Sequence, residues 1–272
     1  MSRQIKRSTP ARRAPTRARP GRPSGRATGR KPGADRAARG AAFARIAADL
    51  EARILDRSLR PGDPLPSETA LAEQYSVHRS TVREAVRRLE SAGLIGRAAG
   101  TKRLRVTRPG QAATTSSLSR ALALDDVTFI ELWEAMLAIA PRTAWLAAAH
   151  PRPENIERLE FCIARVETAR SAEGAVTGVV EFFGSLAATS ANRVLVLAMQ
   201  PVTTLLAPSL RRVIDRVPQG RSRIAVAQRC IVEAMRRGDA EEAQAWMTRH
   251  VQDFRRGYEV AGIALDTRAG DV

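Results

Sequence analysis

The segment between Leu65 and Ile95 restricts the fold of this chain more than any other stretch. It contains two stretches of helical periodicity joined by a short turn, and the second stretch has two distinct faces. Apolar residues occupy one face at helical spacing, namely Val82, Ala85, Val86 and Leu89. The opposite face is rich in arginine. Two short helices of this kind, followed by a hairpin, are typical of a helix-turn-helix, whose second helix enters the major groove of double-stranded DNA.

We expect the polar side of these two helices to contact DNA. Arginine can pair with a guanine edge or a phosphate, and hydroxyl groups at a helix start can reach phosphates. The predicted contacts are Ser67, Thr69, His78, Arg79, Ser80, Thr81, Arg83 and Arg87. A lone basic helix is more often an ordinary solvated face, but the order of helix, turn, helix and hairpin favours DNA binding.

Flanking segments complete the predicted domain. An amphipathic helix is expected from about residue 42 to residue 57, and it ends before the Pro-Gly-Asp-Pro sequence at 61–64. Residues 94–95 and 104–106 are expected to form a β-hairpin. A basic hairpin tip can enter the minor groove or hold phosphates. Its predicted DNA contacts are Gly100, Lys102 and Arg103.

The positive charge of the chain is concentrated at its N-terminal end. The 272 residues carry a net charge of +17, of which residues 1–40 contribute +12, residues 41–108 contribute +5 and residues 109–272 contribute zero. Residues 1–40 contain too few large apolar residues to fold alone, so we predict a disordered basic arm. Within it, Gly21-Arg22-Pro23 resembles the core of an AT-hook, but a nonspecific electrostatic tether is the simpler interpretation.

The rest of the chain has helical periodicity. Residues 109–115 are predicted to be a linker, and breaks are expected near Pro201 and Pro208. The predicted helices span about 116–122, 126–149, 153–171, 174–189, 192–216, 221–237 and 239–259. The predicted fold is mainly α. It has a winged helix-turn-helix over 41–108, an all-helical bundle of about seven helices over 116–262 and a flexible tail over 263–272. Because no stretch of eighteen residues is uninterruptedly apolar, we expect a cytoplasmic protein without a membrane span.

The N-terminal domain resembles the winged helix-turn-helix of the GntR family of bacterial transcription regulators. The family pattern is roughly L-P-S-E-R-x-L-A, followed after four residues by V-S-R-x-T-V-R-E-A-L-x-x-L-x-x-x-G-L. The chain keeps most of it, including Leu65, Pro66, Ser67, Glu68, Leu71, Ala72, Val77, Arg79, Thr81, Val82, Arg83, Glu84, Ala85, Leu89, Gly93 and Leu94. Two departures matter for DNA binding, since Thr69 replaces an arginine and His78 replaces a serine N-cap. These departures leave the operator sequence open.

The C-terminal part resembles the FCD effector-binding domain of the FadR subfamily. One matching stretch is F-H-x-x-L-A-x-x-S-G-N in the family, which reads here from Phe182 to Asn192; the other runs from Ile231 to His250. Most such domains hold a divalent metal with one aspartate and three histidines. The corresponding positions here are Val179, Phe183, Gln228 and His250, and a usual pocket arginine corresponds to Trp133. One imidazole beside an amide is a poor metal site, so no metal or cofactor is expected.

Two interpretations of these replacements stay open. In the first, a pocket persists and binds a hydrophobic small-molecule effector such as a fatty acid or an acyl-CoA. Its predicted lining is Trp133, Val179, Phe183, Gln228 and His250, with Gln228 and His250 supplying hydrogen bonds. In the second, the same side chains fill the core of a domain that serves only dimerisation.

The sequence indicates no catalytic site. The three histidines lie in different segments, and no Gly-rich loop or nucleophile elbow is present, so we do not expect an enzyme. We expect a ligand-responsive repressor that binds a palindromic operator as a homodimer. The alternative is a weakly specific architectural DNA-binding protein driven by the basic arm.

Overall fold

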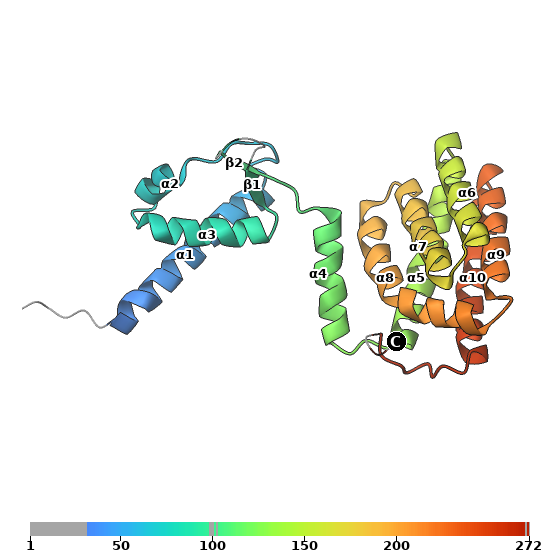
Figure 1. Cartoon of the computed structure of the whole chain (residues 1–272). Helices are drawn as coiled ribbons and strands as arrows, with labels where there is room; N and C mark the ends of the chain where they lie inside the picture. Colours follow the sequence, from blue (N-terminus) through green and yellow to red (C-terminus); the bar gives the residue numbers. More distant parts are fainter. Residues whose placement is uncertain (1–31, 98–100, 102, 270, 272) are drawn as a thin grey trace, which may run out of the picture.

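The computed structural model describes residues 32–97, 101, 103–269 and 271 of the chain. A winged helix unit at the N-terminal side is followed by a helical bundle, whose first helix lies between that unit and the other helices of the bundle (Figure 1). Most of the predicted basic arm lies outside the described residues, as do the predicted hairpin-tip contacts Gly100 and Lys102.

The described residues of the N-terminal unit form three helices and a two-stranded antiparallel sheet. Its elements are α1 (Pro32–Leu55), α2 (Glu68–Gln74), α3 (Arg79–Ser91), β1 (Ile95–Arg97) and β2 (Leu104–Val106), with Ile95 paired to Val106. Helix α1 begins ten residues before the expected start, so the prediction of an arm reaching to residue 40 is wrong for its last part. The cause is local, because a proline is well suited to the first turn of a helix and the alanines that follow favour its continuation.

Apolar faces from all of these elements form one small core. Ile46 and Leu50 of α1, Val82 and Leu89 of α3, and Leu104 of β2 are each at most 4% exposed. Burial of each such side chain contributes about 1.5–3 kcal/mol. This core fixes the rotation of α3 about its axis and therefore decides which of its residues face solvent.

The C-terminal unit is an all-helical bundle, as predicted. Its seven described helices are α4 (Gln111–Leu124), α5 (Phe129–Ala149), α6 (Pro153–Thr168), α7 (Ala172–Thr189), α8 (Arg193–Arg216), α9 (Gly220–Arg236) and α10 (Ala240–Val260). Helix α5 lies inside the bundle and packs against α7, α8, α9 and α10 (Figure 1). Near its start, the ring of Phe129 stacks on that of Tyr258, with 3.6 Å between the ring centroids.

Two segments predicted to be irregular are ordered parts of the bundle. Helix α4 begins at Gln111, inside the predicted linker, because Thr115 is buried and its hydroxyl donates to the Gln200 side chain on α8 at 3.0 Å. A flexible tail was predicted at 263–272, but residues 263–269 instead follow the start of α5. There the backbone N–H of Phe129 donates to the carbonyl of Thr267 at 2.9 Å. The residue types of both segments suggested loops. Tertiary contacts with the rest of the bundle order them instead.

Helix α8 continues through the positions where breaks were predicted. Pro201 and Pro208 lie inside it, and each removes one backbone donor. The carbonyl groups that lose these donors belong to Leu197 and Thr204, which are both exposed, so water can reach them. In Figure 1 the first part of α8 runs beside α7, and its last part turns across the end of the bundle. The prolines therefore bend the helix rather than end it.

Helix α8 is also the one described helix that is long and apolar enough to cross a membrane. It packs against α4, α5 and α7, and several of its residues are buried in the bundle core. These contacts are those of a core helix.

Candidate nucleic-acid interface and effector cavity

Helix α3 presents the two faces that the sequence predicts. Val82, Ala85, Val86 and Leu89 are buried, each at most 1% exposed. The side chains of Arg79, Ser80, Arg83 and Arg87 are exposed. Because three arginines recur at intervals of four residues, they form one stripe along the helix. Arginines on an exposed helix face can pair with phosphates or with guanine edges in the major groove.

One predicted contact at the start of α3 needs correction. Thr81 is only 3% exposed, so its side chain faces the core and is not available to DNA. His78 occupies the N-cap position, but its side chain makes no capping hydrogen bond and is exposed. Its Nδ1 instead lies 3.3 Å from the Ser80 hydroxyl. His78 and Ser80 therefore present polar atoms together at the end of the helix that carries partial positive charge.

The start of α2 lies beside this surface. Ser67 is the N-cap of α2, and its hydroxyl accepts a hydrogen bond from the Ala70 backbone N–H at 3.1 Å. Thr69 is exposed, as is Arg103 at the hairpin. The Arg105 guanidinium donates to the carbonyl of Gly62 at 3.1 Å, which ties the hairpin to the loop before α2.

Glu68 is an organising residue that the sequence reasoning missed. Its carboxylate accepts a hydrogen bond from Arg83 Nε at 2.9 Å and lies 3.4 Å from an Arg97 nitrogen. The Arg83 guanidinium holds the pKa of Glu68 below its ordinary value. Since Arg83 stays 59% exposed, the pair orients this arginine without hiding it. The family pattern contains this glutamate, which was the available signal.

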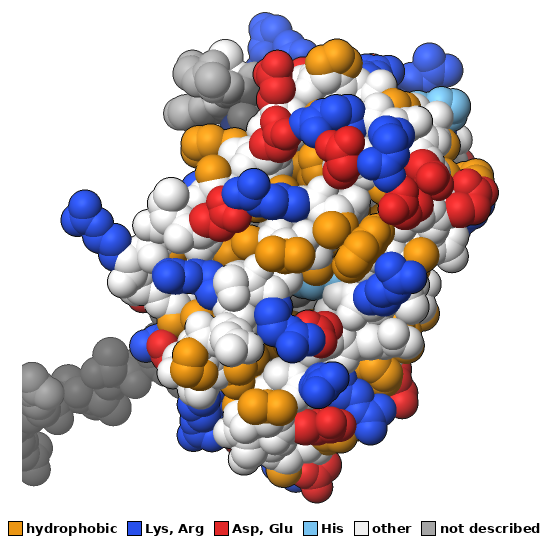
Figure 2. All heavy atoms as spheres, turned by 90° about the vertical axis from the view of Figure 1, so that its right-hand side faces the viewer, with side chains coloured by type: hydrophobic (Ala, Val, Ile, Leu, Met, Phe, Trp, Pro, Cys, Tyr) orange, Lys and Arg blue, Asp and Glu red, His pale blue; other side chains and the backbone are white. Residues whose placement is uncertain are grey.

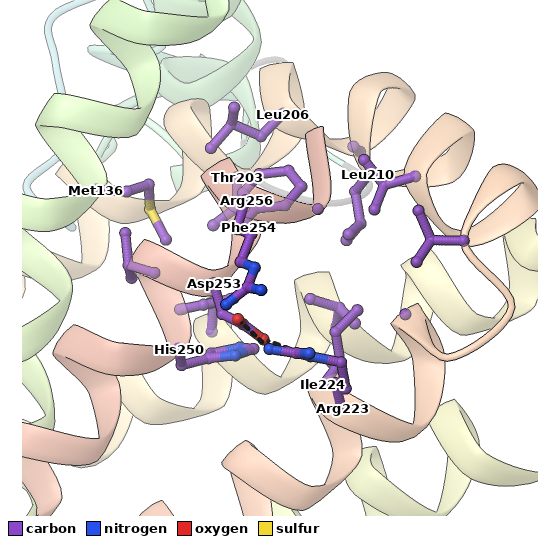
Figure 3. A pocket seen from close by; sticks show the side chains of 18 of the residues that line it. Met136, Thr203, Leu206, Leu210, Arg223, Ile224, His250, Asp253, Phe254 and Arg256 are labelled. Atoms are coloured by element: carbon purple, nitrogen blue, oxygen red, sulfur yellow. Dashed lines mark hydrogen bonds and ion pairs between the residues drawn. The ribbon is translucent and has the colours of Figure 1, made fainter. Parts of the chain in front are cut away.

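A cavity of about 270 Å³ opens between α5, α7, α8, α9 and α10 (Figure 3). Its walls are largely apolar. They come from Met136 and Val179, from Leu206, Leu210 and Val213 on α8, and from Ile224 and Phe254 on the last two helices. Ligand pockets in proteins are typically about 300–1,000 Å³ and apolar with a few placed polar groups. This cavity therefore has the composition of a ligand site and lies near the lower size limit.

Three of the five predicted effector residues line this cavity, namely Val179, Phe183 and His250. The rings of Phe183 and His250 are nearly parallel, with 5.8 Å between their centroids. Burial lowers the pKa of His250 to about 4, and nearby Asp253 opposes this only partly. The imidazole is therefore neutral near neutral pH and behaves as a weakly polar part of an apolar wall.

The other two predicted residues do not line the cavity. The indole N–H of Trp133 donates to the carbonyl of Val251 at 2.8 Å, so this side chain ties α5 to α10. Gln228 is completely buried, and neither its amide nitrogen nor its amide oxygen has a hydrogen-bond partner in the described part of the protein. For these two positions the core interpretation fits better than the pocket interpretation.

An ion pair lies at the polar side of the cavity. Arg223 on α9 binds Asp253 on α10 through two nitrogens, with Nε 2.9 Å from one carboxylate oxygen (Figure 3). This contact raises the pKa of Arg223. Arg256 also lines the cavity on this side. The apolar interior is thus bordered by charged groups that can orient a ligand.

The donor set does not fit the metal that the family resemblance implies. Val179 and Phe183 have no donor atom, Gln228 offers only an amide, and His250 is the single imidazole. Within the described ranges, no three side chains of His, Cys, Asp or Glu are grouped so that they could share an ion. Zinc and similar metals need three or four good ligands.

Several cavity residues on α8 escaped the sequence reasoning. Thr203, Leu206, Leu210 and Val213 line the cavity, although two prolines suggested an interrupted segment there. Their spacing of three and four residues continues through Pro208 and was the signal that could have identified them.

The outer face of the bundle is electrically mixed. Figure 2 shows acidic and basic side chains interspersed across the side formed by the last helices. Many of these charges are paired. Arg229 contacts Glu167, and Arg236 contacts Glu160. This face has none of the single-sign character of a DNA-binding surface.

Comparison with known proteins identifies the family of each structural unit. The family model for bacterial regulatory proteins of the gntR family matches residues 43–101, and the model of the FCD domain matches residues 131–253. The chain belongs to the GntR family. Its FCD domain fits the FadR-type branch. This GntR protein is therefore a DNA-binding transcription regulator and not an enzyme.

Relatives of this GntR regulator include proteins from Escherichia coli. The protein named as the L-lactate dehydrogenase operon regulatory protein is 29% identical over 212 residues, which cover 76% of this chain and 82% of that protein. The Glc operon transcriptional activator is 28% identical over 168 residues, or 59% of this chain and 65% of that protein. The solved structure of Streptococcus agalactiae GntR is 28% identical, with a TM-score of 0.55, and the match covers 79% of this chain and 99% of that one.

Proposed function

We propose that this GntR regulator is a ligand-responsive dimeric repressor whose effector is a compact, predominantly apolar metabolite bound without a metal. The observation that carries the proposal is the apolar cavity, in which Val179 and Phe183 stand where the family resemblance implies metal ligands. The proposed site residues for DNA are Ser67, Thr69, His78, Arg79, Ser80, Arg83, Arg87 and Arg103, and those for the effector are Val179, Phe183 and His250.

The size of the cavity restricts the effector. At about 270 Å³ it can enclose a small ring or a short acyl chain, but not a whole acyl-CoA. A coenzyme A thioester would have to leave its nucleotide outside. We therefore favour a free metabolite of moderate size, with a polar end near Arg223 and Asp253 and an apolar body among the α8 side chains.

A route from the cavity to the DNA-binding unit runs through α8 and α4. The same helix that lines the cavity with Leu206 and Leu210 carries Gln200, whose side chain accepts hydrogen bonds from Gln111 and Thr115 of α4. Helix α4 continues from the connection to β2. A ligand that changes the bend of α8 would move α4. In a dimer, this movement would change the relative positions of the two winged helix units. The ligand acts only if its affinities for the two arrangements differ.

The effector part of the proposal is tested by ligand-dependent stability. The purified protein is heated with straight-chain monocarboxylic acids from butyrate to palmitate, with and without a chelator. A ligand at about one hundred times its Kd stabilises the folded state by about 2.7 kcal/mol. We expect a maximum at intermediate chain length and no effect of the chelator.

A pair of variants shows whether the stabilisation arises in this cavity. Ala207→Phe fills part of it, because Ala207 belongs to its lining. Ala138→Phe is the matched control, since Ala138 lies on the exposed side of α5. Stabilisation lost only in Ala207→Phe supports the proposal. A melting temperature that falls on chelation, or a ligand effect equal in both variants, contradicts it.

Removal of the N-terminal residues distinguishes a sequence-specific regulator from the alternative, a weakly specific architectural DNA-binding protein. Deletion of residues 1–31 preserves α1, which begins at Pro32. If the winged helix determines specificity, the shortened protein keeps sequence-specific binding and loses only salt-dependent affinity. If the basic arm dominates, the deletion removes most binding.

A further inference from the structure

A second hollow, separate from the effector cavity, lies where the two structural units meet. It has a volume of about 840 Å³, and we call it the hinge hollow. Its lining comes from the end of α1, the loop that follows, the connection after β2 and the first residue of α8. The lining residues are Ile54, Leu55, Arg57, Arg60, Pro61, Arg108 and Arg193.

The charge of the hinge hollow is unbalanced. Four of its seven lining residues are arginines, and none is acidic. Within the described part of the chain, none of the side chains of Arg57, Arg60, Arg108 and Arg193 takes part in an ion pair or hydrogen bond. This distinguishes them from the paired arginines of the bundle, such as Arg223 and Arg229. Four guanidinium groups around one hollow repel one another unless an anion lies between them.

The backbone holds one of these arginines in an unusual conformation. Arg57 has a φ of 67°, in the left-handed region that favours glycine. The surrounding chain fixes it there, because the Leu59 backbone N–H donates to the Arg53 carbonyl at 2.8 Å. This is the position after a helix end at which glycine is most common. The sequence nevertheless has an arginine there, and its side chain borders the hollow.

The start of α8 adds to the positive potential. Arg193 is the first residue of this long helix, where the partial charge of the helix dipole is positive. The Asn192 side chain caps the N–H groups of Val194 and Leu195. Leu55, which is 71% exposed, and Pro61 supply apolar surface beside the arginines.

We propose that the hinge hollow binds a phosphate-bearing anion with two or more negative charges. A guanidinium group can bind two phosphate oxygens at once. Four guanidinium groups therefore suit a ligand with several charged oxygens better than they suit a single carboxylate. The phosphate groups have two sources with the same chemistry, the backbone of bound DNA or a free phosphorylated metabolite. In either case the anion connects Arg57 and Arg60 of the winged helix unit to Arg193 of the bundle. It thereby restricts the angle between these two structural units.

Two double variants of the full-length protein test this proposal. Arg57→Gly with Arg193→Gln removes two charges from the hollow, and the glycine suits the left-handed conformation, so folding is preserved. The control is Arg158→Gln with Arg170→Gln, which removes two charges from exposed positions of the bundle. Both proteins then have the same net charge and the same N-terminal residues.

The first measurement is the affinity for inorganic pyrophosphate by calorimetry at low ionic strength. We expect about a tenfold or larger loss in the hollow variant relative to the control. The second is the salt dependence of binding to a nonspecific DNA duplex. Each lost phosphate contact lowers the slope of log K against log salt by about 0.9.

The two measurements distinguish the source of the phosphate. If the salt slope of DNA binding is smaller in the hollow variant but not in the control, the phosphate is that of the DNA backbone. If the slope is unchanged and only pyrophosphate binding is weaker, the phosphate belongs to a free anion. If the two double variants agree in both measurements, the hinge hollow is not an anion site and the proposal is overturned. Neither result depends on the apolar cavity, so failure here and failure of the effector proposal are separate.

Discussion

Replacing Gln228 with methionine should make this protein more stable. Gln228 is completely buried on α9, and its amide nitrogen and oxygen have no partners in the described part of the chain. A buried polar group without a hydrogen bond destabilises the folded state by about 1–3 kcal/mol. Methionine has nearly the same length and flexibility and carries no such group, so it can fill the same space.

The expected gain follows from this penalty. Relief of about 2 kcal/mol corresponds to a rise in Tm of roughly 4–8 °C for a chain of this size. The measurement is thermal or urea unfolding of the two proteins under identical conditions. Gln252→Met is the matched control, because Gln252 is exposed on α10 and the same substitution there should change stability by less than about 0.5 kcal/mol.

The opposite result would refute the reasoning. If Gln228→Met is destabilising while Gln252→Met is neutral, the Gln228 amide has a polar partner in solution. Gln228, which stands where the family has a metal-binding histidine, would then still have a polar role. It would again be assigned to the effector site, as the sequence predicted.

Three further predictions concern other parts of the molecule. Ala191 has a φ of 54° and is exposed, and the related family sequence has glycine there, so Ala191→Gly should stabilise the fold by about 1 kcal/mol in urea unfolding; destabilisation would show that the left-handed conformation is not adopted. Burial lowers the pKa of His250 from 6.5 to about 4, so the unfolded chain binds a proton that the folded chain excludes between these values. The free energy of unfolding should therefore fall as pH decreases from about 6.5 to about 4, with a slope of up to roughly 1.4 kcal/mol per pH unit that His250→Asn removes; identical slopes in both proteins would refute this. Glu68→Gln should leave the fold intact but release Arg83 from its orienting pair, and it should alter operator discrimination more than nonspecific affinity in DNA-binding titrations, whereas an equal loss in both would contradict an orienting role.

The winged helix was predictable because its information is local. The two faces of α3 follow from residue spacing alone, and the buried set of Val82, Val86 and Leu89 agrees with it. Thr81 was misassigned because a hydroxyl at a helix start suggests a phosphate contact, whereas the rotation of α3 on its core turns this residue inward. The residue type shows which contacts a side chain can make. Only tertiary packing determines whether that side chain faces solvent or the core.

The bundle shows where such reasoning ends. Seven helices could be counted from periodicity, but the cavity depends on the bend of α8, which its prolines cause without ending the helix. The resemblance located three lining residues, Val179, Phe183 and His250. It could not exclude Trp133 or Gln228, because a shift of a few ångströms between helices decides whether a side chain borders a cavity or fills the space behind it.

The most direct test of the account is selection of genomic DNA fragments by the purified full-length protein at physiological salt, followed by sequencing of the retained fragments. We predict a few sharp peaks that share a short palindrome, and the loss of these peaks in an Arg83→Gln, Arg87→Gln variant of α3. Diffuse enrichment without a common sequence, unchanged in that variant, would contradict a sequence-specific regulator and support the architectural alternative.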